Sequence, residues 1–386
     1  MADPARPASP STPWSSPLAA LRRDRFFWVL LLVLAGLAAA QPQIIPTYPM
    51  LVDWATIAAL AGLLVLTQAV ESSGALAWLG RALVRRMSTE RVAALSLVSA
   101  AAALSTVLTN DVALFVVVPL TLGLCRITPL PATRLIVFEA LAVNVGSALT
   151  PIGNPQNLFL WQLSQVSFAE FTIHMAPLVA VLSVLLAVLV ALFFAATPLR
   201  IEDRSPSERL DRPLLLAALA MYVPFLVLTD RGEALWGCAL AAGVIAAVRP
   251  RVLARIDWGL LLVFTLMFID LRLVAGLDAA QSAIGGLELA DPVRLYWAGI
   301  GASQLISNVP AVIGLAEYSQ DWRVMAYAAN VGGFGWMVGS LANLIALRMA
   351  QDSRAWISFH LCSVPFLAAA AAAGYGLLFA RNGPGA

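Results

Sequence analysis

Residues 144–157 read NVGSALTPIGNPQN, and residues 330–343 read NVGGFGWMVGSLAN. Both stretches open on Asn-Val-Gly and then repeat a glycine and an asparagine at identical offsets: Gly153 and Asn157, Gly339 and Asn343. Both also lie in strongly apolar sequence, where proline and glycine interrupt a helix and expose backbone groups that lipid cannot satisfy. Paired interruptions of this kind indicate a binding site at the interface of two repeats in a membrane protein.

The composition is that of a polytopic membrane protein. Of the 386 residues, 60% are hydrophobic and 12% are charged, and the mean hydropathy is +0.84. Ordinary soluble domains carry roughly 25% charged residues. The net charge is only +2, and we expect no nucleic-acid partner. The sequence contains no G-x4-G-K-[ST] loop, so ATP hydrolysis by this chain is not expected.

Several apolar segments are long enough, or nearly so, to cross a hydrocarbon layer of roughly 30 Å. We predict about nine full crossings, near 26–42, 53–70, 134–161, 174–197, 213–229, 234–249, 257–276, 323–347 and 356–380. Residues 1–25 are expected to form a cytoplasmic tail, and 26–42 an uncleaved first span, because Gln41-Pro42-Gln43 is not a small-residue cleavage site.

Two further apolar regions, 90–124 and 291–318, carry an asparagine at an internal break. The arm from Asp111 to Leu124 would measure about 21 Å as a helix, which is short for a span and suits a re-entrant hairpin. The stretch Ala75–Met87 combines tryptophan and leucine with arginine and predicts an amphipathic helix at the membrane surface.

Arginine placement orients the chain. With a cytoplasmic N-terminus, most of the arginines fall in cytoplasmic segments, as the positive-inside rule requires. The exceptions are Arg231, Arg294, Arg323 and Arg381 outside, and Arg272 within a span. We therefore expect a multi-pass protein of a bacterial inner membrane with an external C-terminus.

Val52-Asp53-Trp54 and Ile256-Asp257-Trp258 open two similar units. An odd number of crossings separates the two openings, so the units should run in opposite directions across the membrane. The predicted fold is an all-α polytopic membrane protein of inverted-topology repeats, each with a re-entrant hairpin and a broken helix. Residues 26–212 hold the first span and first repeat (hairpin 90–124, broken helix 134–161). Residues 213–386 hold connecting spans and the second repeat (hairpin 291–318, broken helix 323–347).

The hairpin tips and helix breaks supply the candidate substrate and ion ligands. In the first half these are Ser105, Thr109, Asn110, Asp111, Asn144, Thr150, Gly153, Asn154 and Asn157, and in the second Ser307, Asn308, Asn330, Gly332, Gly339, Ser340 and Asn343. An asparagine offers a carbonyl oxygen to Na⁺ and an amide donor to an anion, and we name Asn110, Asp111 and Asn308 as candidate Na⁺ ligands. The alternative for a serine or threonine is that it satisfies the backbone of the tip.

Asp111 is the most informative single residue, because an ionisable group at membrane depth is costly and usually functional. It could ligate Na⁺ or carry a proton, or it could cap the helix that follows. The matching position of the second half is Val309. Glu139 is either functional or reaches the cytoplasmic interface, and Asp270 is either structural or a proton carrier. The three cysteines, Cys125, Cys238 and Cys362, form no close pair and are expected to be free thiols, with metal or arsenic ligation as the alternative.

The order of these motifs resembles the ion transporter superfamily of arsenite permeases, NhaD-type sodium/proton antiporters, divalent anion/sodium symporters and citrate transporters. Thr109-Asn110-Asp111 followed by FVVVP at 115–119, then Ser307-Asn308-Val309-Pro310 and Gly339-Ser340-Leu341-Ala342, look most like the arsenite-permease and NhaD branch. The likeness covers about residues 53–380. The whole chain is also similar to a small group of YbiR-type inner-membrane proteins regarded as anion transporters. The tips differ from the Ser-Asn-Thr of carboxylate symporters, which counts against a dicarboxylate substrate.

The resemblance implies a scaffold with a moving transport domain, often in a homodimer. We expect a secondary active transporter of a small anion or oxyanion, carboxylate- or arsenite-like, that works by alternating access. Na⁺ or H⁺ would be the coupling ion, with no other cofactor and no enzymatic activity. The alternatives are a Na⁺/H⁺ antiporter that uses Asp111 and, more remotely, a sensor or an intramembrane hydrolase built on Asp111 and Asp270.

Overall fold

The computed structural model describes residues 25–84, 87–199, 210–350 and 352–380. The predicted cytoplasmic tail, apart from Arg25, and the chain end at 381–386 lie outside the described residues. Over the described ranges the backbone forms helices, short 3-10 turns and one isolated bridge, between Thr89 and Pro198. The predicted all-helical class is confirmed for this part of the chain.

The first half contains α2 (Arg25–Ala40), α3 (Tyr48–Leu51), α4 (Trp54–Ser72), α5 (Ala75–Val84), α6 (Glu90–Ser105), α7 (Asn110–Cys125), α8 (Ala132–Ser147), α9 (Pro155–Ser164) and α10 (Phe168–Phe193). The second contains α11 (Arg212–Asp230), α12 (Ala234–Val248), α13 (Trp258–Ala275), α14 (Asp278–Gly285), α15 (Pro292–Ile306), α16 (Asn308–Leu315), α17 (Trp322–Gly332), α18 (Leu341–Met349) and α19 (Ala355–Phe379). The 3-10 turns are η1 (Pro42–Thr47), η2 (Pro250–Arg255) and η3 (Met337–Gly339).

Five described helices are long and apolar enough to cross a membrane: α4, α10, α11, α13 and α19. A sixth crossing results if α2 and residues 42–51, which meet at a bend of 119°, count as one span. The other predicted crossings correspond to shorter pieces, since α12 has 15 residues and each interrupted region divides into two helices. The total of about nine crossings stays a prediction.

The Asp-Trp motifs start α4 and α13 in the same way. Asp53 accepts a hydrogen bond from the Thr56 amide, and Asp257 accepts one from the Leu260 amide, both at 3.0 Å. An aspartate in this N-cap position satisfies one of the free amides of the first helical turn. The indole of each following tryptophan donates to a carbonyl five residues back, Trp54 to Pro49 and Trp258 to Leu253. The repeated sequence therefore has a repeated local structure.

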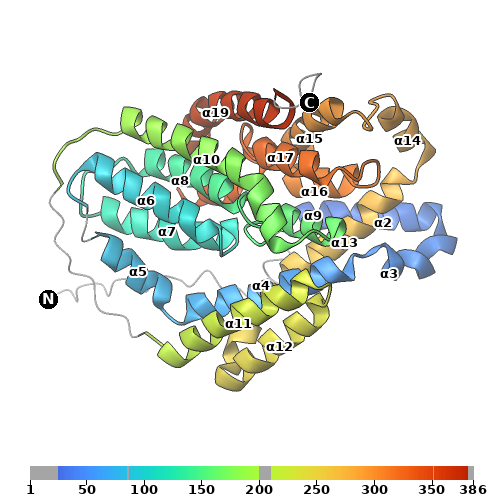
Figure 1. Ribbon diagram of the computed structural model, residues 1–386, viewed down its shortest axis with the longest axis horizontal. Helices are drawn as coiled ribbons and strands as arrows, with labels where there is room; N and C mark the ends of the chain where they lie inside the picture. The colour runs from blue at the N-terminus through green and yellow to red at the C-terminus, as the bar shows by residue number, and fades with distance from the viewer. Residues whose placement is uncertain (1–24, 85–86, 200–209, 351, 381–386) are drawn as a thin grey trace, which may run out of the picture.

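Helix packing brings the two halves together in matched combinations (Figure 1). The hairpin α6–α7 packs on α8, and the hairpin α15–α16 packs on α17. Across the halves, α7 and α8 contact α18, while α16 and α17 contact α9. Each interrupted helix therefore lies between its own hairpin and the pieces of the other interrupted helix.

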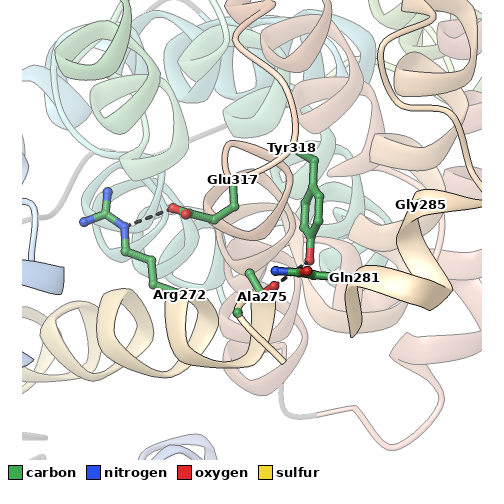
Figure 2. Close-up of a pocket in the computed structure, with 7 residues that line it drawn as sticks. Arg272, Ala275, Gln281, Gly285, Glu317 and Tyr318 are labelled. Atoms are coloured by element: carbon green, nitrogen blue, oxygen red, sulfur yellow. Dashed lines mark hydrogen bonds and ion pairs between the residues drawn. The ribbon is translucent and has the colours of Figure 1, made fainter. Parts of the chain in front are cut away.

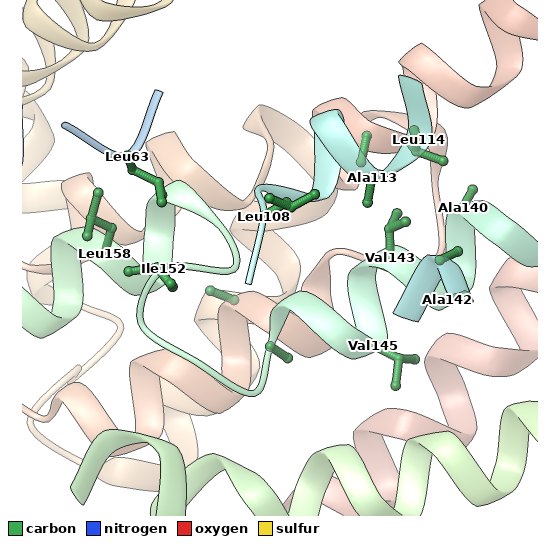
Figure 3. Close-up of a cluster of buried hydrophobic side chains, with 14 of the residues drawn as sticks. Leu63, Leu108, Ala113, Leu114, Ala140, Ala142, Val143, Val145, Ile152 and Leu158 are labelled. Carbon is green, nitrogen blue, oxygen red and sulfur yellow. The ribbon is translucent and has the colours of Figure 1, made fainter. Parts of the chain in front are cut away.

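The interrupted helices form the centre of the molecule. Every residue of α8 from Leu135 to Ser147 is buried, and nearly all of α17 is buried as well. A helix that is buried on all sides has protein neighbours around its whole circumference. Figure 3 shows the apolar side chains around the first break, where Leu63 of α4, Leu108 of the hairpin tip, Ile152 of the break and Leu158 of α9 are all buried.

The start of α8 is also held by the loop between α18 and α19. The Thr133 hydroxyl donates to Asp352 Oδ2 at 2.7 Å, and the Arg354 amide donates to Asp352 Oδ1 at 2.8 Å. These two hydrogen bonds to the ionised carboxylate lower the pKa of Asp352 below its ordinary value. The loop is thus a further contact between the two halves.

Candidate functional site

The first interruption forms because its sequence ends one helix and starts another. Helix α8 ends at Ser147, and α9 begins with Pro155 at its first position, where the missing amide costs nothing. Asn154 caps α9 by accepting a hydrogen bond from the Asn157 amide at 2.9 Å. The second interruption relies on glycine instead. Gly335 has a φ of +90°, a conformation that favours glycine.

Four asparagines connect the two interruptions by a reciprocal exchange of hydrogen bonds. Asn144 Nδ2 donates to Asn343 Oδ1 at 2.9 Å, and Asn330 Nδ2 donates to Asn157 Oδ1 at 2.7 Å. Asn144 and Asn330 occupy the same position before the two breaks, and Asn157 and Asn343 the same position after them. Each half therefore supplies the donor of one bond and the acceptor of the other.

Several other bonds of these four side chains repeat as well, although Asn157 alone also donates to the carbonyls of Ala148 and Thr150. Asn144 and Asn330 each also donate to the carbonyl four residues back, on Ala140 and Ala326. Asn157 and Asn343 each donate to the carbonyl ten residues back, on Ser147 and Gly333. The first break also contributes a side-chain amide that the second lacks. Asn154 Nδ2 donates to Asn330 Oδ1 at 2.9 Å, and the position that matches Asn154 in the second break is Ser340.

The hairpin tips are attached to the breaks by different means in the two halves. The backbone amide of Asn110 donates to the Gly153 carbonyl at 3.0 Å, and the Thr150 hydroxyl donates to the Thr106 carbonyl at 2.5 Å. In the second half, the side chain of Gln304 connects the tip to the break. Its amide nitrogen donates to the carbonyls of Gly332 (2.6 Å) and Phe334 (3.0 Å), and its oxygen accepts from the Trp336 amide at 2.8 Å.

Gln304 was not among the candidate substrate and ion ligands selected from the sequence. The available signal was its place directly after Ser303, which matches the place of Thr106 directly after Ser105. Thr106 participates through its backbone and Gln304 through its side chain, so residue type alone did not reveal the shared position. The tertiary structure adds both to the set of residues that hold the tips.

The repeated serines and glycines form the close contact between each hairpin and its interrupted helix. A Cβ atom built on Gly146 would overlap the Ala102 carbonyl oxygen and lie 2.5 Å from Ser105 Oγ. One built on Gly332 would lie 2.5 Å from Ser303 Cβ. The hydroxyls of Ser105 and Ser303 donate to carbonyls of their own helices. Both serines therefore have a structural role at a close crossing of small residues.

Gly153 and Gly339, the later glycines of the repeated pattern, allow each break to fold back on itself. A Cβ atom on Gly153 would lie 2.7 Å from Ser147 Cα, and one on Gly339 would lie 2.6 Å from the Gly332 carbonyl oxygen. Of the other predicted site residues, Thr109, Thr150 and Ser340 are all buried. The structure thus brings the predicted tip and break residues of each half into one region.

Gly333 marks the place where the second tip meets the first break. A Cβ atom on this glycine would lie 3.4 Å from Asn144 Oδ1 and 3.5 Å from Asn308 Nδ2. The nearest atom would be the Asn330 carbonyl oxygen at 3.2 Å, so the glycine lets the backbone pack closely against two amide side chains from different halves. Ser307, which precedes Asn308 in the chain, has φ 74° and ψ 156°, a backbone conformation used almost only by glycine. Backbone strain of this kind concentrates at functional sites.

Asp111 does not cap helix α7, so that alternative is wrong. The N-cap is Thr109, and Asp111 lies in the first turn, where its amide donates to Asn110 Oδ1 at 3.0 Å. Asp111 Oδ1 is buried and has no hydrogen-bond partner among the described residues. The carboxylate within electrostatic range of Asp111 is Asp257. Both carboxylate oxygens of Asp270 are likewise buried without a described partner.

The site is closed in this structure. The exposed fraction is 4% or less for Asn110, Asn144, Asn154, Asn157, Asn308, Asn330 and Asn343. A pocket of about 450 Å³ lies elsewhere, at the end of α13, and Figure 2 shows its lining with the ion pair between Arg272 and Glu317 at 3.0 Å. Within the described residues, no three His, Cys, Asp or Glu side chains gather as a metal site, and the three cysteines are free.

Comparison with known proteins gives two matches that cover most of the chain and a third that covers part of it. The inner membrane protein YbiR of Escherichia coli is 46% identical over 361 residues, which is 94% of this chain and 97% of that protein. An uncharacterized transporter of Methanocaldococcus jannaschii is 31% identical over 312 residues, 78% of this chain and 83% of its own. A silicon efflux transporter of Oryza sativa is 34% identical over 122 residues, 31% of this chain and 25% of its own.

These relatives and the apolar helices identify a multi-pass inner-membrane protein that acts as a membrane transporter. The resemblance inferred from the tip and break motifs is confirmed at the family level, since the sequence model described as citrate transporter matches residues 18–324. At the centre of the protein, each half has an interrupted helix, and the two breaks are joined through asparagine side chains. The chain belongs to the citrate transporter family.

Proposed function

We propose that the protein is a secondary active transporter of a small anion or oxyanion, carboxylate- or arsenite-like, that works by alternating access with Na⁺ or H⁺ as the coupling ion. The reciprocal exchange among Asn144, Asn343, Asn330 and Asn157 carries this proposal. It gathers neutral amides and broken-helix backbone from both halves at one buried place, and such a place suits an anion that is met by amide donors and helix ends.

The proposal includes an inverted repeat. The matched bonds at positions 144 and 330, at 157 and 343, and at the starts of α4 and α13 support two units related by an axis in the membrane plane. The hairpins α6–α7 and α15–α16 would then enter from opposite sides, with a cytoplasmic N-terminus. The nine crossings and the homodimer predicted from the sequence belong to the same proposal.

In the proposed cycle the closed site opens when a hairpin tip separates from its break. The bonds that must change are those from Asn110 to Gly153 and from Thr150 to Thr106 in the first half and those around Gln304 in the second. Each set is small, since a net hydrogen bond contributes about 0.5–1.5 kcal/mol. The Asn308 side-chain nitrogen, which lies beside Gly333, is the proposed donor to an anionic oxygen once the site opens, and Asn110, Asp111 and Asn308 remain the proposed Na⁺ ligands.

Asn308→Ala is expected to lower anion flux by about tenfold or more. The reason is that a hydrogen bond to a charged group contributes about 1.5–3 kcal/mol, and each 1.4 kcal/mol or so is a factor of about ten. The measurement is radiolabelled uptake into liposomes that contain the purified protein, with citrate, arsenite and silicic acid as probes and with Na⁺ or pH gradients applied separately.

The control for this experiment is Gly301→Ala in the same hairpin, where a Cβ atom would meet nothing within 4 Å. This variant should transport like the unaltered protein. Full activity in both Asn110→Ala and Asn308→Ala would remove these residues from the site. Gradient-driven flux with none of the probes would instead argue against the proposed substrate class.

A second candidate function, Na⁺/H⁺ antiport through Asp111, is favoured by the buried Oδ1 atom without a described partner. Asp111→Asn is then expected to abolish Na⁺-dependent proton movement after a pH jump, because an amide cannot exchange a proton in this range. The measurement uses vesicles that contain a pH-sensitive dye. If Asp111→Asn leaves that proton movement intact, antiport through this residue is excluded.

A further inference from the structure

Glu139 is an acidic side chain enclosed within the helical core. It lies in the middle of α8, and its exposed fraction is 0%. The Thr121 hydroxyl of α7 donates to Glu139 Oε1, and Oε2 is buried without a hydrogen-bond partner among the described residues. One hydroxyl bond does not offset the cost of burying an ionised carboxylate.

The charged groups on the helices around α8 do not neutralise this carboxylate. Glu90 and Arg91 lie in the first turn of α6, Glu170 and His174 in the first turns of α10, Arg348 at the end of α18, and His360 and Cys362 in α19. On α7 the titratable groups are Asp111 at the far end and Cys125, whose thiol is within electrostatic range of Glu139. On α8 itself, Arg134 donates to the Phe193 carbonyl. No ion pair between described residues includes Glu139.

The second half fills the corresponding position without a charge. Five residues before Asn330 stands Met325, as Glu139 stands five residues before Asn144. Met325 is buried within α17, so an apolar side chain satisfies the packing at this position. Packing alone therefore does not explain why the first half has a carboxyl group, that of Glu139, at this position.

We propose that Glu139 is a proton-binding site, and that its bound proton holds the hairpin arm α7 against the interrupted helix α8. The neutral carboxyl keeps the bond to Thr121, and loss of the proton leaves a carboxylate that is stable only where water reaches it. Arm α7 carries the tip residue Asn110 at one end and Thr121 about 16 Å along the helix. Thr121 lies only five residues before Arg126, which is exposed just beyond α7, so the site lies nearer this end of the arm than the tip.

This proposal deepens the proposed function, on which its coupling role rests, by naming H⁺ as a coupling ion and Glu139 as its carrier. Opening of the α7–α8 contact would expose the carboxyl and release the proton, while closure would require a proton to be taken up. The tip at Asn110 moves with the same arm, so proton binding and the opening of the substrate site would be linked through α7.

The proton site itself can be tested without a known substrate. Infrared pH titration of the full-length protein in lipid should show the carbonyl stretch of a protonated carboxylic acid at neutral pH. Glu139→Gln should remove this band, and Thr121→Val should shift it, because the carboxyl loses a hydrogen bond. The matched control is Glu170→Gln, which makes the same change at an exposed glutamate paired with Arg323. Asp111→Asn and Asp270→Asn assign the bands of the other buried carboxyls.

An unchanged band in both Glu139→Gln and Thr121→Val would show that Glu139 is ionised and would overturn the proton site. The coupling role has a separate readout in liposomes with citrate or arsenite. Glu139→Gln should reduce uptake driven by a pH gradient at least tenfold and spare exchange at equal pH on both sides. Retention of pH-driven uptake would exclude coupling through Glu139 even if the band is lost. Absence of any flux in the unaltered protein would count against the proposed function, whereas the infrared result would stand.

Discussion

Gly146→Ala is expected to force the first hairpin away from the interrupted helix and to abolish transport. The new methyl group would overlap the Ala102 carbonyl oxygen, a backbone atom of α6 that cannot rotate away. Extra atoms in a well-packed core typically cost about 1–3 kcal/mol, and more where the backbone must shift. Gly332→Ala should behave in the same way, because its Cβ would lie 2.5 Å from Ser303 Cβ and 3.3 Å from Ile300 Cα.

The same substitution at an open position provides the control. Gly123 in α7 and Gly301 in α15 have nothing within 4 Å of a built Cβ. Alanine there should leave transport unchanged and stabilise the protein by about 0.5–1 kcal/mol, since glycine is unfavourable inside a helix. Thermal unfolding in detergent and flux in liposomes measure both effects. If Gly146→Ala unfolds at the same temperature as Gly123→Ala, the close helix crossing described here is incorrect.

The second large effect is expected at the reciprocal asparagines. Asn330→Ala removes the donor to the buried Asn157 Oδ1, whereas Asn154 Nδ2, which also bonds to Asn330, keeps its bonds to Ser147. A buried polar atom left without a partner costs about 1–3 kcal/mol, so the free energy of unfolding should fall by roughly that amount. Because the two breaks are then no longer joined on this side, flux should be lost as well.

Double-mutant cycles separate the bonds from general damage. The pairs 330/157 and 144/343 should each show a coupling energy of about 0.6 kcal/mol, and at most about 1.7 kcal/mol, as hydrogen bonds between membrane helices do. As a control, Thr229 is a buried polar residue of α11, a helix that packs on α4 and α12. Asn330→Ala with Thr229→Ala should show almost no coupling. Coupling in only one of the two asparagine pairs would show that the exchange is not reciprocal.

Much of the local structure follows from short motifs. Asp53 and Asp257 cap their helices because an aspartate one residue before an apolar run accepts a hydrogen bond from a free amide. Asn154-Pro155 restarts a helix for the same kind of reason. The role of Asp111 as a cap could not be decided in this way, because Thr109, Asn110 and Asp111 can each start a helix, and tertiary packing placed the start at Asn110.

The contacts between distant segments could not be predicted to the same degree. Equal spacing of Asn144, Asn157, Asn330 and Asn343 showed that the two halves correspond, but an amide can both donate and accept, so spacing does not say which asparagine meets which. The role of Gln304 was missed because its three partners come from a break that lies 28–32 residues further along the chain.

The sequence by itself determined a helical membrane protein with two interrupted helices and a duplicated set of asparagines, because hydropathy, proline, glycine and capping act over a few neighbouring residues. Only the tertiary structure decided that the amides of one break pair with those of the other, that Gly146 and Gly332 bring hairpin and helix into contact, and that Glu139 is enclosed without an ion-pair partner among the described residues. These features depend on distances between segments that are far apart in the chain, and such distances are set by the packing of whole helices.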